Sequence, residues 1–199
     1  EAPRTMVLPG VAKATRVCAY DRPGTTASIG DEDFISRSDP IAQPRTSVEV
    51  VEELHALLQA AGIPGPYILA GHSLGGFFAR LYAATYPDEV VGMVLVDASH
   101  EEQDVRFPAA LPAEQWAAFE RMVEAVTRPG DIPDLERMDL DASFDQLREA
   151  ATTHPLPPLP LVVLTRGLPA SADIPPEGLS ALPPDFPWDA YDAVWHELQ

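Results

Sequence analysis

Apolar runs typical of strands alternate along this chain with segments whose apolar residues recur at the spacing of a helix face. Strand-like runs cover residues 14–20, 67–70, 90–96 and 161–165, and we expect those at 14–20 and 161–165 to be buried. Helical spacing covers residues 46–61, 74–86, 112–126, 143–151 and 188–198. Strands separated by helices imply right-handed crossovers, so the pattern predicts an α/β fold with a mainly parallel sheet flanked by helices.

Local signals set the ends of these elements. Thr46 and Glu49 form a capping box that begins the first helix, and Gly62 ends it. Pro87 lies just beyond the end of the second helix. By contrast, residues 1–13 show little pattern, and residues 25–45 are interpreted as a polar loop.

A glycine-flanked serine, Ser73, stands between the strand at 67–70 and the helix that follows. This strand–turn–helix context is what a nucleophile elbow requires, although glycine-rich turns also carry such motifs by chance. The turn is so tight that we expect strained backbone at Ser73. Because Gly71 and Gly75 lack a Cβ, the strand and helix can approach each other there.

The elbow predicts distinct roles for the residues around it. The Ser73 hydroxyl would project from the top of the sheet as a nucleophile, and the backbone N–H of Leu74 would point toward a developing oxyanion. His72 neighbours Ser73 on a sharp turn, so its side chain is expected to point away and to pack against the protein.

Three segments together resemble the α/β-hydrolases, in the esterase- and lipase-like branch with a serine nucleophile. The order and spacing match over residues 14–100, and a weaker match returns at 159–166 and 195–199. The resemblance implies an α/β-hydrolase fold that cleaves a small, apolar, ester-like acyl substrate, without a metal or organic cofactor. The matching segments are 15–24, 66–76 and 94–101.

The resemblance also implies a division of the chain. Residues 1–98 would form the first part of the hydrolase core, 99–155 a helical cap, and 156–199 a continuation of the core that ends before its last strand. An aromatic stripe at helical spacing would either pack on the core or line an apolar pocket over Ser73. The stripe comprises Trp116, Phe119, Val123 and Val126, and residues 143–151 add Phe144, Leu147 and Ala151.

Two carboxylates are candidates for the acid of a Ser–His–Asp triad. Asp97 follows the strand at 90–96, at the sheet edge where ligands bind in open parallel sheets. Asp173 lies in the loop after the strand at 161–165, the commoner position in the family, but several residues beyond the strand end. We favour Asp97, whose alternative role is that of a turn or capping carboxylate.

The histidine base departs from the family pattern. In the family it follows one more strand, so we expect the base to be absent from this chain and the chain alone to be nearly inactive. His100, three residues after Asp97, is the alternative. His55 is expected to be a surface or hydrogen-bonded histidine and His196 to face the surface, whereas His154 precedes the proline-rich connector. In the family, a second oxyanion donor comes from a loop after an early strand that often contains His-Gly, and residues 1–13 contain no such motif. We therefore expect a fragment with an unpaired sheet edge.

Composition narrows the function classes further. A hydrophobic content of 46% predicts one domain with a sizeable core, and no apolar run approaches the ~20 residues of a membrane span. The net charge of −18 argues against nucleic acid and anionic membranes as partners. Cys18 is the single cysteine, expected to be buried in the strand at 14–20, which fits a reducing, cytoplasmic compartment.

Two functions remain open from the sequence. The first is a serine-dependent acyl hydrolase acting through Ser73. The second is a catalytically silent α/β-hydrolase scaffold that binds a small ligand or a protein partner, because a fold alone does not determine activity.

Overall fold

The computed structural model describes residues 2–24, 26–29, 32–35, 41–127, 136–156, 158–172 and 174–199. The chain divides into two compact units. One comprises residues 1–45 and 132–137, and the other comprises residues 46–131 and 138–199.

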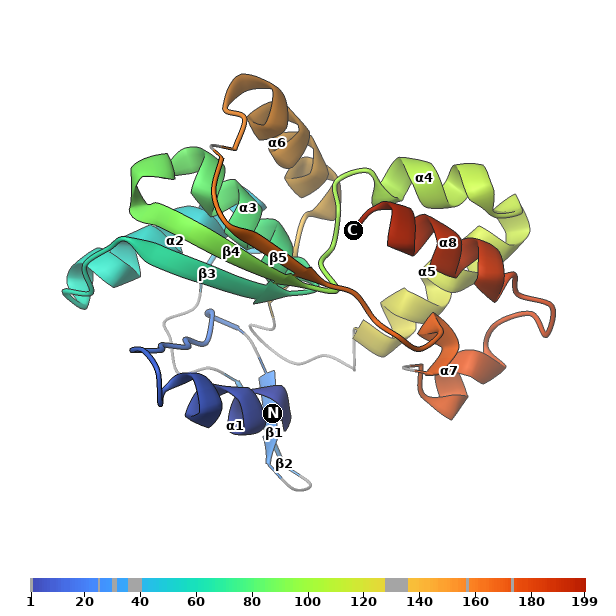
Figure 1. The fold of residues 1–199 in the computed structure, drawn as a ribbon. Coiled ribbons are helices and arrows are strands. Elements are labelled where there is room, and N and C mark those ends of the chain that lie inside the picture. The colour runs from blue at the N-terminus through green and yellow to red at the C-terminus, as the bar shows by residue number, and fades with distance from the viewer. Residues whose placement is uncertain are drawn as a thin grey trace. The chain divides into compact units, whose positions relative to one another are not determined.

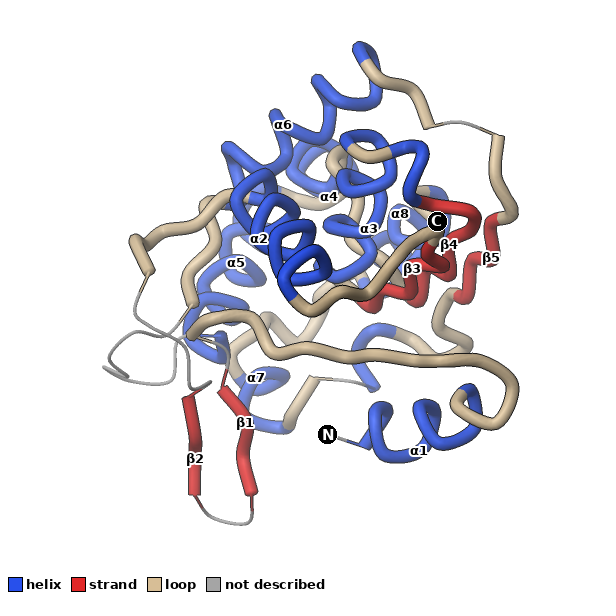
Figure 2. Tube along the Cα trace, turned by 90° about the vertical axis from the view of Figure 1, so that its left-hand side faces the viewer, coloured by secondary structure: helices blue, strands red, loops and turns tan. Residues whose placement is uncertain are grey.

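The first unit contains helix α1 (Ala2–Val11) and an antiparallel pair of strands, β1 (Thr26–Ile29) and β2 (Glu32–Ile35) (Figure 2). Glu136 accepts hydrogen bonds from Arg22 and from the buried Arg45, with Arg45 Nη1 at 3.0 Å. The prediction of little pattern before residue 14 and of a loop over 25–45 was therefore wrong where the structure describes those residues.

The predicted strand at residues 14–20 does not form. In the described chain these residues pair with no strand, most of them are exposed, and Cys18 is exposed rather than buried. An apolar run becomes a strand only where a neighbouring strand takes up its backbone hydrogen bonds. Whether such a neighbouring strand is present depends on the tertiary fold, and the local sequence of residues 14–20 does not determine it.

The second unit is built on a parallel sheet in the order β3–β4–β5. Its strands β3 (Tyr67–His72), β4 (Val90–Val96) and β5 (Leu161–Leu164) confirm three predicted strands. The central strand, β4, buries Val90, Met93 and Leu95, whereas all four residues of β5 are exposed. The expectation of a buried strand at 161–165 was therefore wrong: among the described strands β5 pairs only with β4, and its side chains remain exposed.

Three helices pack together with this sheet. Helix α3 (Leu74–Thr85) forms the crossover from β3 to β4, followed by a short 3₁₀ turn η1 (Pro87–Glu89), and contacts α2 (Ser47–Ala60) and α6 (Leu140–Thr153) (Figure 1). The α/β architecture with a helix-flanked parallel sheet is confirmed. Residues buried between these elements include Val50, Val51, Phe77, Tyr82 and Leu147.

The predicted signals at the ends of α2 are also confirmed. The Thr46 hydroxyl accepts the backbone N–H of Glu49, and the Glu49 carboxylate accepts the backbone N–H of Thr46 at 2.6 Å. Gly62 has φ +61°, a conformation that glycine adopts without strain.

A separate helical layer lies beyond the carboxyl ends of the strands (Figure 1). It comprises α4 (Gln103–Ala110), α5 (Ala113–Thr127), η2 (Ala170–Ala172), α7 (Pro176–Ser180) and α8 (Trp188–Glu197). Phe107, Tyr191 and Trp195 lie at the centre of its aromatic core, and Phe107 stacks on Tyr191 with ring centroids 4.5 Å apart. Helices α5 and α8 were predicted, whereas α4 and α7 were not.

The buried faces of α5 and α6 differ in part from the predicted stripes. On α5, Ala118 and Met122 are buried, whereas Val123 remains 37% exposed. On α6, Leu147 is buried as expected, but Ala151 is exposed. The side chain of Val126 lies outside the described residues.

Two helices of the second unit pack across the boundaries predicted from the sequence. Helix α6, within the predicted cap, packs on α2 and α3, whereas α8, within the predicted core continuation, packs on α4. The division at 98/99 and 155/156 stays a prediction. Among the helices that the structure describes, none is both long and apolar enough to cross a membrane.

Candidate active site

Ser73 occupies a strained turn between β3 and α3. Its backbone has φ 52° and ψ −126°, in the positive-φ region that non-glycine residues rarely adopt. Its N–H donates to Val96 O at 3.1 Å, and its carbonyl accepts the N–H groups of Gly76 and Ser99, both at 3.0 Å. The backbone of the predicted nucleophile is therefore held on both sides.

The glycines around Ser73 explain how so tight a turn can form. A Cβ on Gly71 would lie 2.2 Å from the carbonyl oxygen of Gly75, and a Cβ on Gly76 would lie 2.5 Å from Ala98 Cβ. A Cβ on Gly75 would meet nothing within 4 Å. The close approach of strand and helix therefore requires glycine at positions 71 and 76. The expectation that it also requires the missing Cβ of Gly75 was wrong.

The two residues that flank Ser73 differ in their surroundings. Leu74 is the first residue of α3, where backbone N–H groups have no partner within the helix, as an oxyanion donor requires. His72 is exposed, so the expectation that it packs was wrong. The alternation along β3 places it on the same exposed face as Ile68 and Ala70.

Asp97 lies beside Ser73 at the carboxyl edge of the sheet. His72 pairs with Val96 and Val96 with Leu164, so Ser73, Asp97 and Thr165 follow at the ends of three adjacent strands. Asp97 also has positive φ, at 45°. The second acid candidate, Asp173, lies outside the described residues.

In the described residues, the Asp97 carboxylate is bound by the segment after β5 and by α8 rather than by a histidine. Its Oδ1 accepts Trp195 Nε1–H at 2.7 Å and the backbone N–H of Arg166 at 3.2 Å, and its Oδ2 lies 2.6 Å from Arg166 Nη2. Burial raises the pKa of Asp97, but the hydrogen bonds from Arg166 and Trp195 outweigh it, so the pKa falls below its ordinary value.

The His100 ring is bound within its own loop, and in the described residues no hydrogen bond joins it to Ser73 or Asp97. Its Nδ1 accepts the backbone N–H of Glu102 at 3.1 Å, so the proton of the neutral ring is on Nε2. Burial lowers the pKa of His100, more than the neighbouring Glu101 raises it. The neutral ring is therefore the favoured form at this site.

The other histidines have partners elsewhere. His55 stacks on Tyr86 with ring centroids 4.0 Å apart, and His196 Nδ1 lies 3.2 Å from Thr165 Oγ1. His154 contacts Thr153. In the described ranges, no hydrogen bond joins a histidine to Ser73 or to Asp97. The described residues therefore place a serine and a carboxylate side by side without a histidine between them.

A buried charge network follows the Asp97 loop, and sequence reasoning missed it. Glu101 accepts Arg80 at 2.6 and 2.8 Å, and its backbone carbonyl accepts Arg148 Nη2 at 2.6 Å. Burial raises the pKa of Glu101, but the hydrogen bonds from Arg80 lower it by more, so the pKa lies below its ordinary value. The one signal in the sequence was Arg80 itself, a charge within an otherwise apolar helical run.

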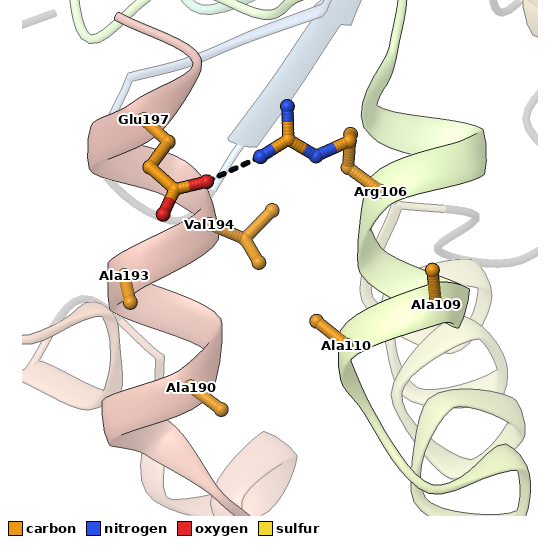
Figure 3. A pocket seen from close by; sticks show the side chains of 7 residues that line it. All are labelled: Arg106, Ala109, Ala110, Ala190, Ala193, Val194 and Glu197. Carbon is orange, nitrogen blue, oxygen red and sulfur yellow. Dashed lines mark hydrogen bonds and ion pairs between the residues drawn. The ribbon is translucent and has the colours of Figure 1, made fainter.

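A hollow of about 350 Å³ lies between α4 and α8 (Figure 3). Alanines from both helices line it, and Arg106 and Glu197 form an ion pair at one end. None of its lining residues belongs to the elbow. Within the described residues, no group of three or more His, Cys, Asp or Glu side chains is arranged to hold a metal ion.

A sequence model of the alpha/beta hydrolase fold family matches residues 2–145, which include Ser73 and Asp97. The chain belongs to the α/β-hydrolase fold family. The family resemblance of the sequence is thereby confirmed, and the sheet, crossover and elbow described above are those of an α/β-hydrolase.

Relatives of this α/β-hydrolase include lipases. The chain is 45% identical to lipase LipV of Mycobacterium tuberculosis over 97 residues, which cover 47% of this chain and 36% of that protein. It is 37% identical to an uncharacterised Schizosaccharomyces pombe protein over 92 residues, 46% of this chain and 15% of the relative. The match thus covers well under two thirds of either relative.

Among solved structures, this α/β-hydrolase is similar to a carboxylesterase structure from Nitrososphaera gargenis. The sequence identity is 16% and the TM-score is 0.46, over 98% of this chain and 84% of that chain. The family assignment rests on the sequence match.

Proposed function

We propose that this α/β-hydrolase is a serine-dependent acyl hydrolase that cleaves carboxylic esters of small, apolar substrates. The observation that carries the proposal is the backbone of Ser73, at φ 52° between a strand end and a helix start. Residues hold such strained conformations mainly where function uses them, at a cost of about 1–3 kcal/mol each.

In the proposed reaction, Ser73 Oγ attacks the acyl carbon, its hydroxyl proton passes to a base and from the base to the departing alcohol oxygen, and the carbonyl oxygen becomes an oxyanion. The backbone N–H of Leu74 would donate to that oxyanion. Collapse of the intermediate expels the alcohol, and water then releases the acid from the acyl-serine. The sequence offers two candidates, Asp97 and Asp173, for the acid that orients a base.

The test is hydrolysis of a series of p-nitrophenyl esters, from acetate to octanoate, by the 199-residue chain and by Ser73→Ala. Because no described histidine contacts Ser73, we expect ester turnover by the unmodified chain to be low, and turnover by Ser73→Ala to be absent. Intact-mass analysis after incubation with a fluorophosphonate provides a second readout, with one adduct expected on the chain and none on the variant. Equal rates and no adduct would contradict the proposal.

A silent scaffold that binds a small apolar ligand is the second candidate. The described residues favour it in one respect, because the Asp97 carboxylate is bound by Arg166 and Trp195 and no described histidine contacts Ser73. Under this alternative, Ser73→Ala leaves the binding of short-chain esters, measured by calorimetry, unchanged while ester turnover is absent in both proteins.

A further inference from the structure

We propose that Asp97, Arg166 and Trp195 form a positioning clamp that holds the backbone of Ser73 in its reactive conformation, so that Asp97 is a positioning residue rather than the triad acid. This inference rests on the proposed function of Ser73 and assigns the residues that support it. It leaves Asp173 as the sequence candidate for the acid.

The Asp97 carboxylate already has several hydrogen-bond donors around it. Three N–H groups, from the Trp195 indole and from the backbone and side chain of Arg166, bind its two oxygens. The Arg166 guanidinium also lies over the Trp195 ring, 4.4 Å from its centroid. An orienting acid directs an oxygen to the N–H of a histidine. Here the donors come from Trp195 and Arg166, and no described histidine is hydrogen-bonded to either oxygen of Asp97.

The clamp also fixes a loop. Asp97 N–H donates to Leu164 O, and its φ of 45° persists only if surrounding contacts hold it. Beside it, Gln199 makes two hydrogen bonds to the backbone of Ala98, accepting its N–H at 3.0 Å and donating to its carbonyl at 2.8 Å. Residues 97–98 are therefore tied to both β5 and the end of α8.

This loop is in turn connected to the elbow. Ser99 N–H donates to Ser73 O at 3.0 Å, and Ala98, 6% exposed, lies where Gly76 approaches so closely that a Cβ would clash at 2.5 Å. A shift of the loop would therefore move the carbonyl of Ser73. Displacements of about 1 Å in such a site cost up to about 100-fold in rate.

A matched pair of variants tests the clamp. Trp195→Phe removes the N–H that Asp97 accepts but keeps an aromatic ring, and Trp188→Phe makes the same change at the other end of α8. Trp188 packs in the same aromatic cluster, on Phe186 and Tyr191, away from Asp97. Both substitutions remove the same indole atoms, from a buried side chain at 195 and from a partly buried one at 188. Urea unfolding of both variants therefore accompanies the comparison, so that a loss of packing alone is recognised by its cost in stability.

Two readouts are measured on the full chain. We expect Trp195→Phe to slow fluorophosphonate labelling of Ser73 by about tenfold, and to speed amide hydrogen exchange of Ser99 by about tenfold. Trp188→Phe should leave both within twofold. Unchanged labelling and unchanged Ser99 exchange in Trp195→Phe would overturn the clamp.

The outcomes separate the clamp from the proposed function. If the unmodified chain is neither labelled nor active on esters, the proposed function fails, and the exchange of Ser99 decides the clamp by itself. If Trp195→Phe does not fold, Gln199→Ala replaces it, because that variant removes both side-chain bonds to Ala98 and leaves the aromatic core intact.

Discussion

At the scale of single residues, the elbow depends on where a Cβ can be placed. Gly71 faces the backbone carbonyl of Gly75, whereas Gly75 itself faces open space. The motif in the sequence treats these two glycines alike, and the structure separates them. This difference gives a matched pair of alanine substitutions within one turn.

We expect Gly71→Ala to destabilise the protein by about 3 kcal/mol, because the new Cβ meets backbone that cannot rotate away. Gly75→Ala should be neutral or stabilising by up to about 1 kcal/mol, since alanine reduces the entropy of the unfolded chain. Urea denaturation of both variants measures this. A Gly75→Ala cost equal to that of Gly71→Ala would contradict the packing described for the turn.

Asp97 also predicts a dependence of stability on pH. Because its pKa is lowered in the folded state, Asp97 stabilises the fold above the pKa of the unfolded chain, about 3.9. That contribution is lost as the pH falls from about 4 through the folded-state pKa. Asp97→Asn should therefore flatten the decrease of the melting temperature below pH 4. Asp88→Asn, at an exposed position, is the control. An unchanged acid profile in Asp97→Asn would count against the assignment.

At the scale of elements, the loop between β4 and α4 is held by the pairing of Glu101 with Arg80 of α3 and by Arg148 of α6. The Glu101 and Arg80 side chains are 8% and 17% exposed. A buried pair is costly to break because the remaining charge is left without its partner. The network thus joins three elements that are distant in the sequence.

We expect Glu101→Gln to destabilise the protein by about 3 kcal/mol or more. Glu102→Gln is the neighbouring control, because that carboxylate is 54% exposed and lies 3.7 Å from Arg106, and it should cost no more than about 1 kcal/mol. Thermal and urea unfolding compare the two. Similar losses in both variants would mean that Glu101 is not the centre of the network.

At the scale of the whole molecule, the described sheet of the second unit has an apolar edge. Leu161, Val162 and Leu164 of β5 are each at least 50% exposed. A strand with unpaired backbone groups and apolar side chains favours pairing with other chains. We therefore expect the chain to self-associate, with β5 as the surface through which it does so.

We expect Val162→Lys to reduce self-association, measured by sedimentation velocity across a concentration series. A charge on an edge strand opposes strand pairing between copies. Leu57→Lys, on the exposed side of α2, is the control and should leave the association unchanged. If both variants sediment like the unmodified chain at all concentrations, β5 is not an association surface.

The sequence by itself determined the elements whose signals are local. The capping box at Thr46, the turn at Gly62, the strand at 90–96 and the elbow at Ser73 each depend on residues a few positions apart, so spacing alone predicted them. Tertiary structure decided the features that depend on distant partners. Residues 14–20 found no strand to pair with, β5 remained exposed, and the Asp97 carboxylate was bound by Arg166 and Trp195, 69 and 98 positions away. The residue type sets which bonds a side chain can make, but the tertiary fold decides which distant groups come close enough to make them.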